Sequence, residues 1–172
     1  MIKIEKHEKD FQAVKWVLRA RSVNNTFKPF YTCLFSDGEN VVCTDGQRLH
    51  MIKPVREVPA GLYDVISTTK EIVLVESKVD NSFPDYKQVL YGGKEKPEPL
   101  SGWNTLHGGA ETLFDIMSKD VCLNPKHIED VCKDCGKLTV ISFESKITRL
   151  LSIRITNDFG TAIVATIPTK KE

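Results

Sequence analysis

The sequence predicts an α+β domain made of two β-α-β-β-β halves with antiparallel sheets and one helix per half. Three observations support this fold class. Short apolar runs are separated by turn residues such as Asp37-Gly38. Two stretches, starting near Glu8 and Asn124, instead have apolar residues at helical spacing. The order of expected elements is the same in the first and last thirds of the chain, which indicates an internal pseudo-repeat.

The first half covers about residues 1–56. Its helix is expected over residues 8–21, where apolar residues fill a broad arc. Its strands are expected over residues 2–5, 29–36, 40–44 and 47–53. Between the last two strands, Asp45-Gly46 predicts a tight corner, because glycine tolerates positive φ and aspartate can accept hydrogen bonds from nearby backbone.

A connector, an insertion and the second half complete a single expected domain, residues 1–172. The connector, residues 57–91, holds two expected strands, 61–67 and 71–77. Residues 92–118 are rich in glycine and proline and predict an insertion. In the second half, residues 119–170, Asn124 is expected to cap a helix that begins at Pro125. The elements expected there are a strand at 121–123, a helix to about residue 135, and strands at 137–144, 149–156 and 160–168.

Composition narrows the function classes. The chain has 172 residues, 41% of them hydrophobic, which is enough for a core. Its formal net charge of +1 does not by itself indicate a nucleic-acid-binding protein. Its apolar runs are far shorter than the roughly 18 residues that span a bilayer, and the first six residues lack a signal-peptide core. We therefore expect a cytoplasmic protein with no membrane contact.

Five cysteines, an odd number, favour reduced thiols. Cys132 and Cys135 fall on the apolar stripe of the second helix, which favours core thiols. A zinc site would need two further ligands at matching spacing, and no second Cys-x-x-Cys is present. We expect neither a metal nor another cofactor.

Several motifs then point to a family. Residues 44–49, Thr-Asp-Gly-Gln-Arg-Leu, resemble the Thr-Asp-Gly-His-Arg-Leu motif of bacterial DNA polymerase III β subunits, the sliding clamps. Residues 83–90, Phe-Pro-Asp-Tyr-Lys-Gln-Val-Leu, resemble a second clamp motif. Residues 123–131 look like the start of the last clamp helix, and residues 165–170 look like the clamp ending. The resemblance covers about three quarters of the chain and excludes residues 92–118.

The resemblance implies a non-enzymatic replication protein. Clamps encircle duplex DNA, and a hydrophobic pocket on them takes peptide tails of polymerases and other replication proteins. Carried over by motif, the pocket residues are Thr44, Gly46, Gln47, Arg48, Leu49, Pro84, Lys87, Gln88, Val89, Ala165, Ile167 and Pro168. In this interpretation Gly46 leaves an opening and Arg48 either binds the peptide or orients the loop; the alternative is that these residues only pack a strand corner. The residues expected to face DNA are Lys15, Arg19, Lys126 and Lys133.

The chain departs from the clamp pattern in length and charge. A bacterial clamp chain has three such domains and its ring has twelve inner helices, so two helices per chain would require a homo-oligomer of six copies. Gln47 replaces the motif histidine, and Lys87-Gln88 replaces an arginine pair. In the second helix, acidic residues offset Lys126 and Lys133. Encirclement of duplex DNA therefore stays open, and the alternative is a clamp-fold interaction module that does not bind DNA.

An enzyme is the third class of function considered. The candidate catalytic groups are Cys43, Asp45, His50 and His107. His50 and Asp45 flank a turn, but the sequence contains no nucleophile elbow and no phosphate-loop pattern. We therefore expect the protein not to be an enzyme.

Overall fold

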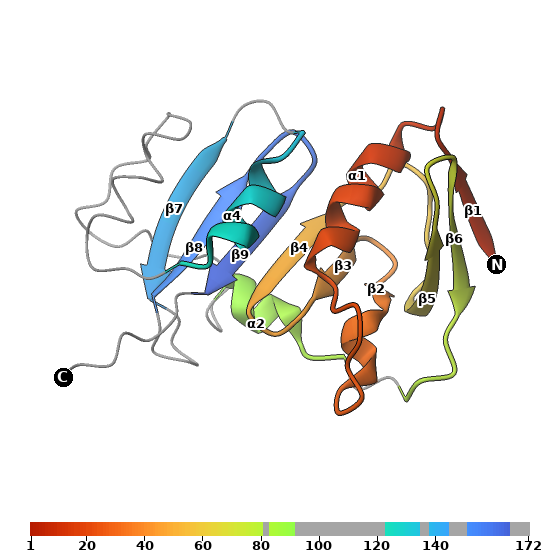
Figure 1. The fold of residues 1–172 in the computed structure, drawn as a ribbon, viewed down its shortest axis with the longest axis horizontal. Helices are drawn as coiled ribbons and strands as arrows, with labels where there is room; N and C mark the ends of the chain where they lie inside the picture. Colours follow the sequence, from red (N-terminus) through yellow and green to blue (C-terminus); the bar gives the residue numbers. More distant parts are fainter. Residues whose placement is uncertain (81–82, 92–122, 135–137, 145–150, 166–172) are drawn as a thin grey trace. The chain divides into compact units, whose positions relative to one another are not determined.

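The computed structural model describes residues 1–80, 83–91, 123–134, 138–144 and 151–165. These residues form an α+β structure (Figure 1). The contacts divide the chain into two compact units, Met1–Pro84 and Asp85–Glu172. Among the helices in the described ranges, none is both long enough and apolar enough to cross a membrane.

The first unit is an antiparallel sheet in the order β1-β6-β5-β2-β3-β4 with one helix against it. Its strands are β1 (Ile2–Glu5), β2 (Leu34–Ser36), β3 (Val41–Thr44), β4 (Arg48–Ile52), β5 (Gly61–Ser67) and β6 (Glu71–Glu76). The helix α1 (Asp10–Val17) continues into a 3-10 turn, η1 (Leu18–Ala20), and a second 3-10 turn, η2 (Pro29–Thr32), precedes β2. The helix lies against β1, β3, β4 and β6 (Figure 1).

The connector strands belong to this same sheet. Ile4 of β1 is paired with Ile72 of β6, and Leu34 of β2 is paired with Tyr63 of β5. The half expected over residues 1–56 is therefore only part of a larger sheet. Strand β1 finds its partner about 70 residues later in the chain, which a reading of local patterns does not reveal.

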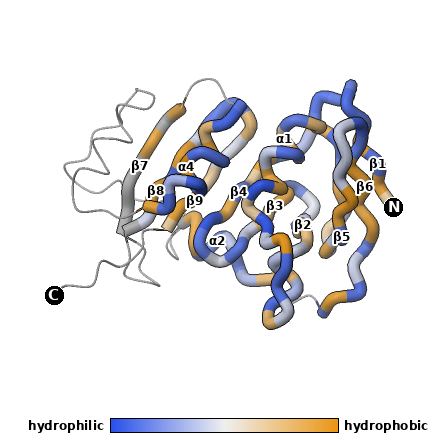
Figure 2. Tube along the Cα trace, viewed as in Figure 1, coloured by the Kyte–Doolittle hydropathy of each residue, from blue (hydrophilic) through white to orange (hydrophobic). Residues whose placement is uncertain are grey.

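The core of the first unit lies between α1 and the sheet. Phe11, Val14 and Val17 of the helix are buried, together with apolar residues such as Ile4 and Ile52 on the strands. All four residues of β3 are buried, and β6 carries an uninterrupted apolar run, Ile72 to Val75, between Glu71 and Glu76; Figure 2 shows apolar colour along these strands. Burial of these apolar surfaces is the main favourable term in folding this unit.

Asp10 ties the start of α1 to the chain that follows β4. Its Oδ1 accepts a hydrogen bond from the backbone N–H of Val55 at 2.8 Å, and its Oδ2 accepts one from Arg56 at 2.7 Å. Asp10 is buried, so both carboxylate oxygens need such partners. The N-terminal end of a helix also favours a negative charge.

The strand predicted over residues 29–36 is wrong in its first part. Pro29–Thr32 form η2, and only Leu34–Ser36 form a strand. Pro29 has no backbone N–H to pair in a sheet, and its carbonyl accepts a hydrogen bond from the Thr32 hydroxyl at 2.8 Å. These two features favour a local turn over an extended strand.

The second unit contains a three-stranded antiparallel sheet in the order β9-β8-β7. Its elements are α2 (Tyr86–Tyr91), α4 (Pro125–Cys132), β7 (Thr139–Glu144), β8 (Leu151–Thr156) and β9 (Thr161–Ala165). Of these two helices, α4 is the one expected in the second half, and α2 lies in the connector just after Pro84. The Asn124 side chain accepts the Lys126 N–H at 3.0 Å, as expected for an N-cap.

Three other predictions, for a strand, a helix end and the insertion, have different outcomes. Leu123 is the only described residue of the strand expected at 121–123, and it lies in the loop before α4. The helix ends at Cys132, three residues before the expected end, and Asp134 has a positive φ of 63°. The insertion at 92–118 lies outside the described residues.

Candidate functional site

The corner between β3 and β4 is the part of the predicted pocket that the first unit builds. The Asp45 Oδ1 accepts the backbone N–H groups of Gln47 at 2.9 Å and Arg48 at 3.0 Å. The Thr44 hydroxyl accepts the Gly46 N–H at 3.0 Å and donates to the Arg48 carbonyl at 2.6 Å. Two side chains therefore hold the backbone of the corner in one shape.

Arg48 is turned into the corner. Its Nε lies 3.0 Å from the Asp45 Oδ2, and its side chain is only 8% exposed. A charge-assisted hydrogen bond in such a place is stronger than one on the open surface. Arg48 was expected either to bind the peptide or to orient the loop. The contact with Asp45 favours orientation of the loop.

Gly46 does not leave the opening that we expected. A Cβ atom added there would lie 3.2 Å from the Tyr31 hydroxyl oxygen and 3.3 Å from two carbons of the Tyr31 ring. The φ of Gly46 is also +91°, a conformation that L side chains rarely adopt. Glycine is thus required here both by the backbone and by the close approach of Tyr31.

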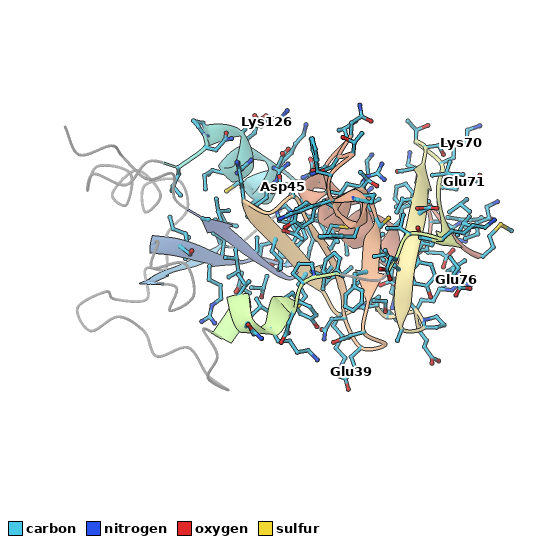
Figure 3. The ribbon with its side chains drawn as sticks, turned by 90° about the horizontal axis from the view of Figure 1, so that it is seen from below. Glu39, Asp45, Lys70, Glu71, Glu76 and Lys126 are labelled. Atoms are coloured by element: carbon cyan, nitrogen blue, oxygen red, sulfur yellow. The ribbon has the colours of Figure 1, made fainter. Side chains whose placement is uncertain are left out.

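Only half of the six predicted pocket residues in the first unit are accessible to a ligand. Thr44, Arg48 and Leu49 are buried, whereas Gly46 and Gln47 are exposed. Figure 3 labels Asp45 at this corner and Glu39 at the other end of the β2–β3–β4 meander. A peptide could therefore touch the corner chiefly through the Gly46-Gln47 backbone and the Gln47 side chain.

Pro84, the last predicted pocket residue of this unit, is exposed and follows an aromatic cluster. The Phe83 ring stacks on Phe35, with centroids 4.6 Å apart and planes 9° apart. Phe30 meets the edge of Phe83 at 6.2 Å. Stacked and edge-on ring pairs of this kind fix where the chain leaves the sheet.

The other predicted pocket residues belong to the second unit. On α2, Lys87, Gln88 and Val89 are exposed while Tyr86 and Leu90 are buried. Ala165 is half-buried at the end of β9. Ile167 and Pro168 lie outside the described residues.

The four residues expected to face DNA are also divided between the units. On α1 and η1, Lys15 is exposed and Arg19 is half-buried. On and after α4, Lys126 and Lys133 are exposed, and so are Glu129 and Asp134. The surface of α4 is therefore mixed in charge, as its sequence indicated.

The candidate catalytic residues in the described ranges have structural contacts. His50 is fully buried, its ring stacks on Trp16, and its Nδ1 lies 3.0 Å from the Trp16 carbonyl oxygen. Cys43 pairs with His50 across β3 and β4 and is fully buried, and burial raises the pKa of its thiol, which disfavours the nucleophilic thiolate. His107 lies outside the described residues.

A second buried thiol contact was not anticipated from the sequence. The Cys33 Sγ lies 3.5 Å from the Asp64 Oδ1, which also accepts the Ser77 hydroxyl at 2.8 Å. Burial raises the pKa of Cys33, so its thiol stays protonated and can donate to the carboxylate. Within the described ranges, no three potential ligands are grouped to hold a metal ion, and Cys132 is only half-buried.

No family model matches this chain, and no curated protein matches it in sequence.

Proposed function

We propose that this chain is a cytoplasmic, sliding-clamp-like replication accessory protein that binds peptide segments of a DNA polymerase or another replication protein. The observation that carries the proposal is the corner at residues 44–48, which has the clamp-like sequence and a preformed shape. A rigid corner loses little conformational entropy when a peptide binds. Its exposed Gly46-Gln47 edge offers backbone and amide groups for hydrogen bonds with an extended peptide.

Duplex DNA is the second proposed partner. Lys15 on α1 is exposed, and Arg19 follows it on η1 at the spacing of one helical turn. Cations arranged in this way can contact the phosphates of a duplex. In the proposed assembly six copies close a ring around the DNA, and the protein performs no chemistry.

The mixed charge on α4 favours a second candidate function. Lys126 and Lys133 are exposed, but Glu129 and Asp134 are exposed as well. Such a surface attracts a polyanion weakly. The alternative is therefore a clamp-fold interaction module that binds partner peptides without encircling DNA.

Peptide binding is tested with a labelled C-terminal tail peptide of a bacterial replicative polymerase. Gln47→Ala and Val89→Ala change one exposed predicted pocket residue in each unit, and each is expected to weaken binding by about fivefold or more. Glu39→Ala is the matched control, because Glu39 is exposed at the far end of the meander and outside the predicted pocket. Binding that is absent, or that all three variants retain equally, would contradict the proposed pocket.

Encirclement is tested by light scattering and by retention on DNA at low salt. A ring is expected to give an assembly of about six chains, by the helix count above. It should remain on circular duplex DNA and slide off the linear form. A monomer or dimer that ignores DNA but binds the peptide would leave the interaction module as the function.

A further inference from the structure

The loop between η1 and η2 exposes two large apolar side chains. We call residues 21–28 the Phe27 loop. Phe27 is 96% exposed and Val23 is 89% exposed. The loop projects from the end of α1 beyond η2 in Figure 1, and apolar colour appears at its tip in Figure 2. An aromatic ring so fully in water adds nothing to the core of this unit.

The backbone of the Phe27 loop is nevertheless held in place. The Ser22 N–H donates to the Tyr31 carbonyl at 2.9 Å, which closes the base of the loop. The Asn25 side chain accepts the Lys28 N–H at 2.8 Å, and the Lys28 carbonyl accepts the Tyr31 N–H at 3.0 Å. Arg21 also donates to the Thr32 carbonyl at 3.3 Å. Presentation of Phe27 in a preformed loop reduces the entropy lost on binding.

The chain around this loop is strongly one-sided in charge. Residues 11–36 contain no aspartate or glutamate, although the whole chain has 24 basic and 23 acidic residues. The four cations of this segment are Lys15, Arg19, Arg21 and Lys28. Lys28 follows Phe27 directly in the chain. This distribution favours an anionic partner at the loop.

We infer that the Phe27 loop binds single-stranded DNA, with Phe27 stacked on an unpaired base and Lys28 near the adjacent phosphates. Proteins that bind single strands combine cations along the backbone with aromatic rings on which bases stack. A base within a duplex is already stacked on both faces, so an exposed ring reaches an unpaired base at lower cost. The inference goes beyond the proposed clamp function and depends neither on ring closure nor on peptide binding.

The test is fluorescence anisotropy of the full chain with a labelled oligothymidine of about 12 nucleotides, a length within the usual site size of one binding domain. Phe27→Ala is expected to weaken binding about tenfold, the loss of one stacked base. Phe27→Trp should retain binding because tryptophan also stacks. Lys28→Gln should reduce the slope of log affinity against log salt by about 0.7, the value for one phosphate contact on a single strand.

Val55→Ala is the matched control, because Val55 is 79% exposed in the same unit and lies outside the acid-free segment. It should bind like the wild type. Thermal melting is expected to show all four variants folded, since each changes an exposed side chain.

Any of four results would overturn the inference. The first is that the wild type fails to bind the oligothymidine, and the second is that Phe27→Ala binds it as tightly as the wild type. The third is that the same variant loses binding to anionic phospholipid vesicles while its DNA binding is unchanged, which would assign the loop to a membrane surface. Equal Phe27-dependent binding to duplex DNA would also contradict base stacking as the mechanism.

Discussion

The ring of His50 stacks on the ring of Trp16, with centroids 4.3 Å apart and planes 21° apart, and its Nδ1 hydrogen-bonds to the Trp16 carbonyl oxygen. Trp16 lies on α1 and His50 on β4, so this contact joins the helix to the sheet. Both residues are fully buried. A histidine that the sequence offered as a catalytic candidate is thus a core residue that holds α1 in place.

Replacement of His50 by alanine should destabilise the first unit by about 3 kcal/mol, because it opens a cavity and removes both the stack and the hydrogen bond. Urea unfolding followed by circular dichroism measures the change through the midpoint. Val55→Ala, at an exposed site of the same unit, should change stability by less than about 0.5 kcal/mol. Equal effects of the two substitutions would show that the stack does not stabilise the fold.

Asp45→Ala should lower the free energy of unfolding by about 2–3 kcal/mol. The substitution removes the acceptor of two backbone N–H groups and the partner of the buried Arg48 Nε. Asp37→Ala is a matched control, since the Asp37 Oδ1 accepts two backbone N–H groups, of Glu39 and Asn40, in a similar turn. We expect about 1 kcal/mol for that variant. If Asp45→Ala lowers the free energy of unfolding no more than Asp37→Ala does, a stabilising role for the guanidinium contact is contradicted.

Gly46→Ala should destabilise the protein more than Gly38→Ala. Both glycines have positive φ, +91° and +95°, so both substitutions carry a backbone cost of about 1 kcal/mol. Only at Gly46 does the new Cβ meet a ring, that of Tyr31, and the crowding should add about 1 kcal/mol or more. In a Tyr31→Ala background the extra cost should vanish. If it persists in thermal unfolding, Tyr31 is not its cause.

Stability should fall in alkaline solution through Cys43. Burial raises the pKa of its thiol above the usual 9.0, so the folded state holds a proton that the unfolded state releases. The contribution of the protonated Cys43 thiol to the free energy of unfolding is fully present below about pH 9. It is lost as the pH rises towards the pKa of Cys43 in the folded state. The loss approaches about 1.4 kcal/mol per pH unit for one group.

The check is the slope of the free energy of unfolding between about pH 8 and pH 10, which brackets the ionisation of an ordinary thiol. The slope should be steeper in the wild type than in Cys43→Ala, whatever the absolute stability of the variant. Equal slopes would show that Cys43 ionises alike in both states.

Much of the first unit could be predicted from local pattern. The span of β5, Gly61–Ser67, agrees with its prediction, and β3, β4 and β6 agree to within a residue at each end. Asp37-Gly38 and Asp45-Gly46 form turns as expected, because their conformational preferences are local. The prediction of a strand before Leu34 was wrong. The aromatic pair Phe30-Tyr31 has the composition of a strand, although the preceding proline favours a turn.

The candidate site was less predictable, because it depends on residues distant in the chain. The sequence indicated a rigid corner at Asp45-Gly46, and the hydrogen bonds of Asp45 agree with that expectation. It could not indicate that Tyr31 closes over Gly46 or that Arg48 turns inward. Those contacts depend on how the segments that carry these residues pack against one another in the folded unit.

By itself, then, the sequence determined where most strands and the tight turns of the first unit form, because those choices depend on the periodicity of apolar residues and on glycine and aspartate at single positions. Only the tertiary structure decided that β1 pairs with β6, that His50 stacks on Trp16 and that Phe27 stays in water. The physical reason is that apolar surface is buried between segments that are far apart in the chain. A local sequence pattern does not indicate which of these segments come into contact.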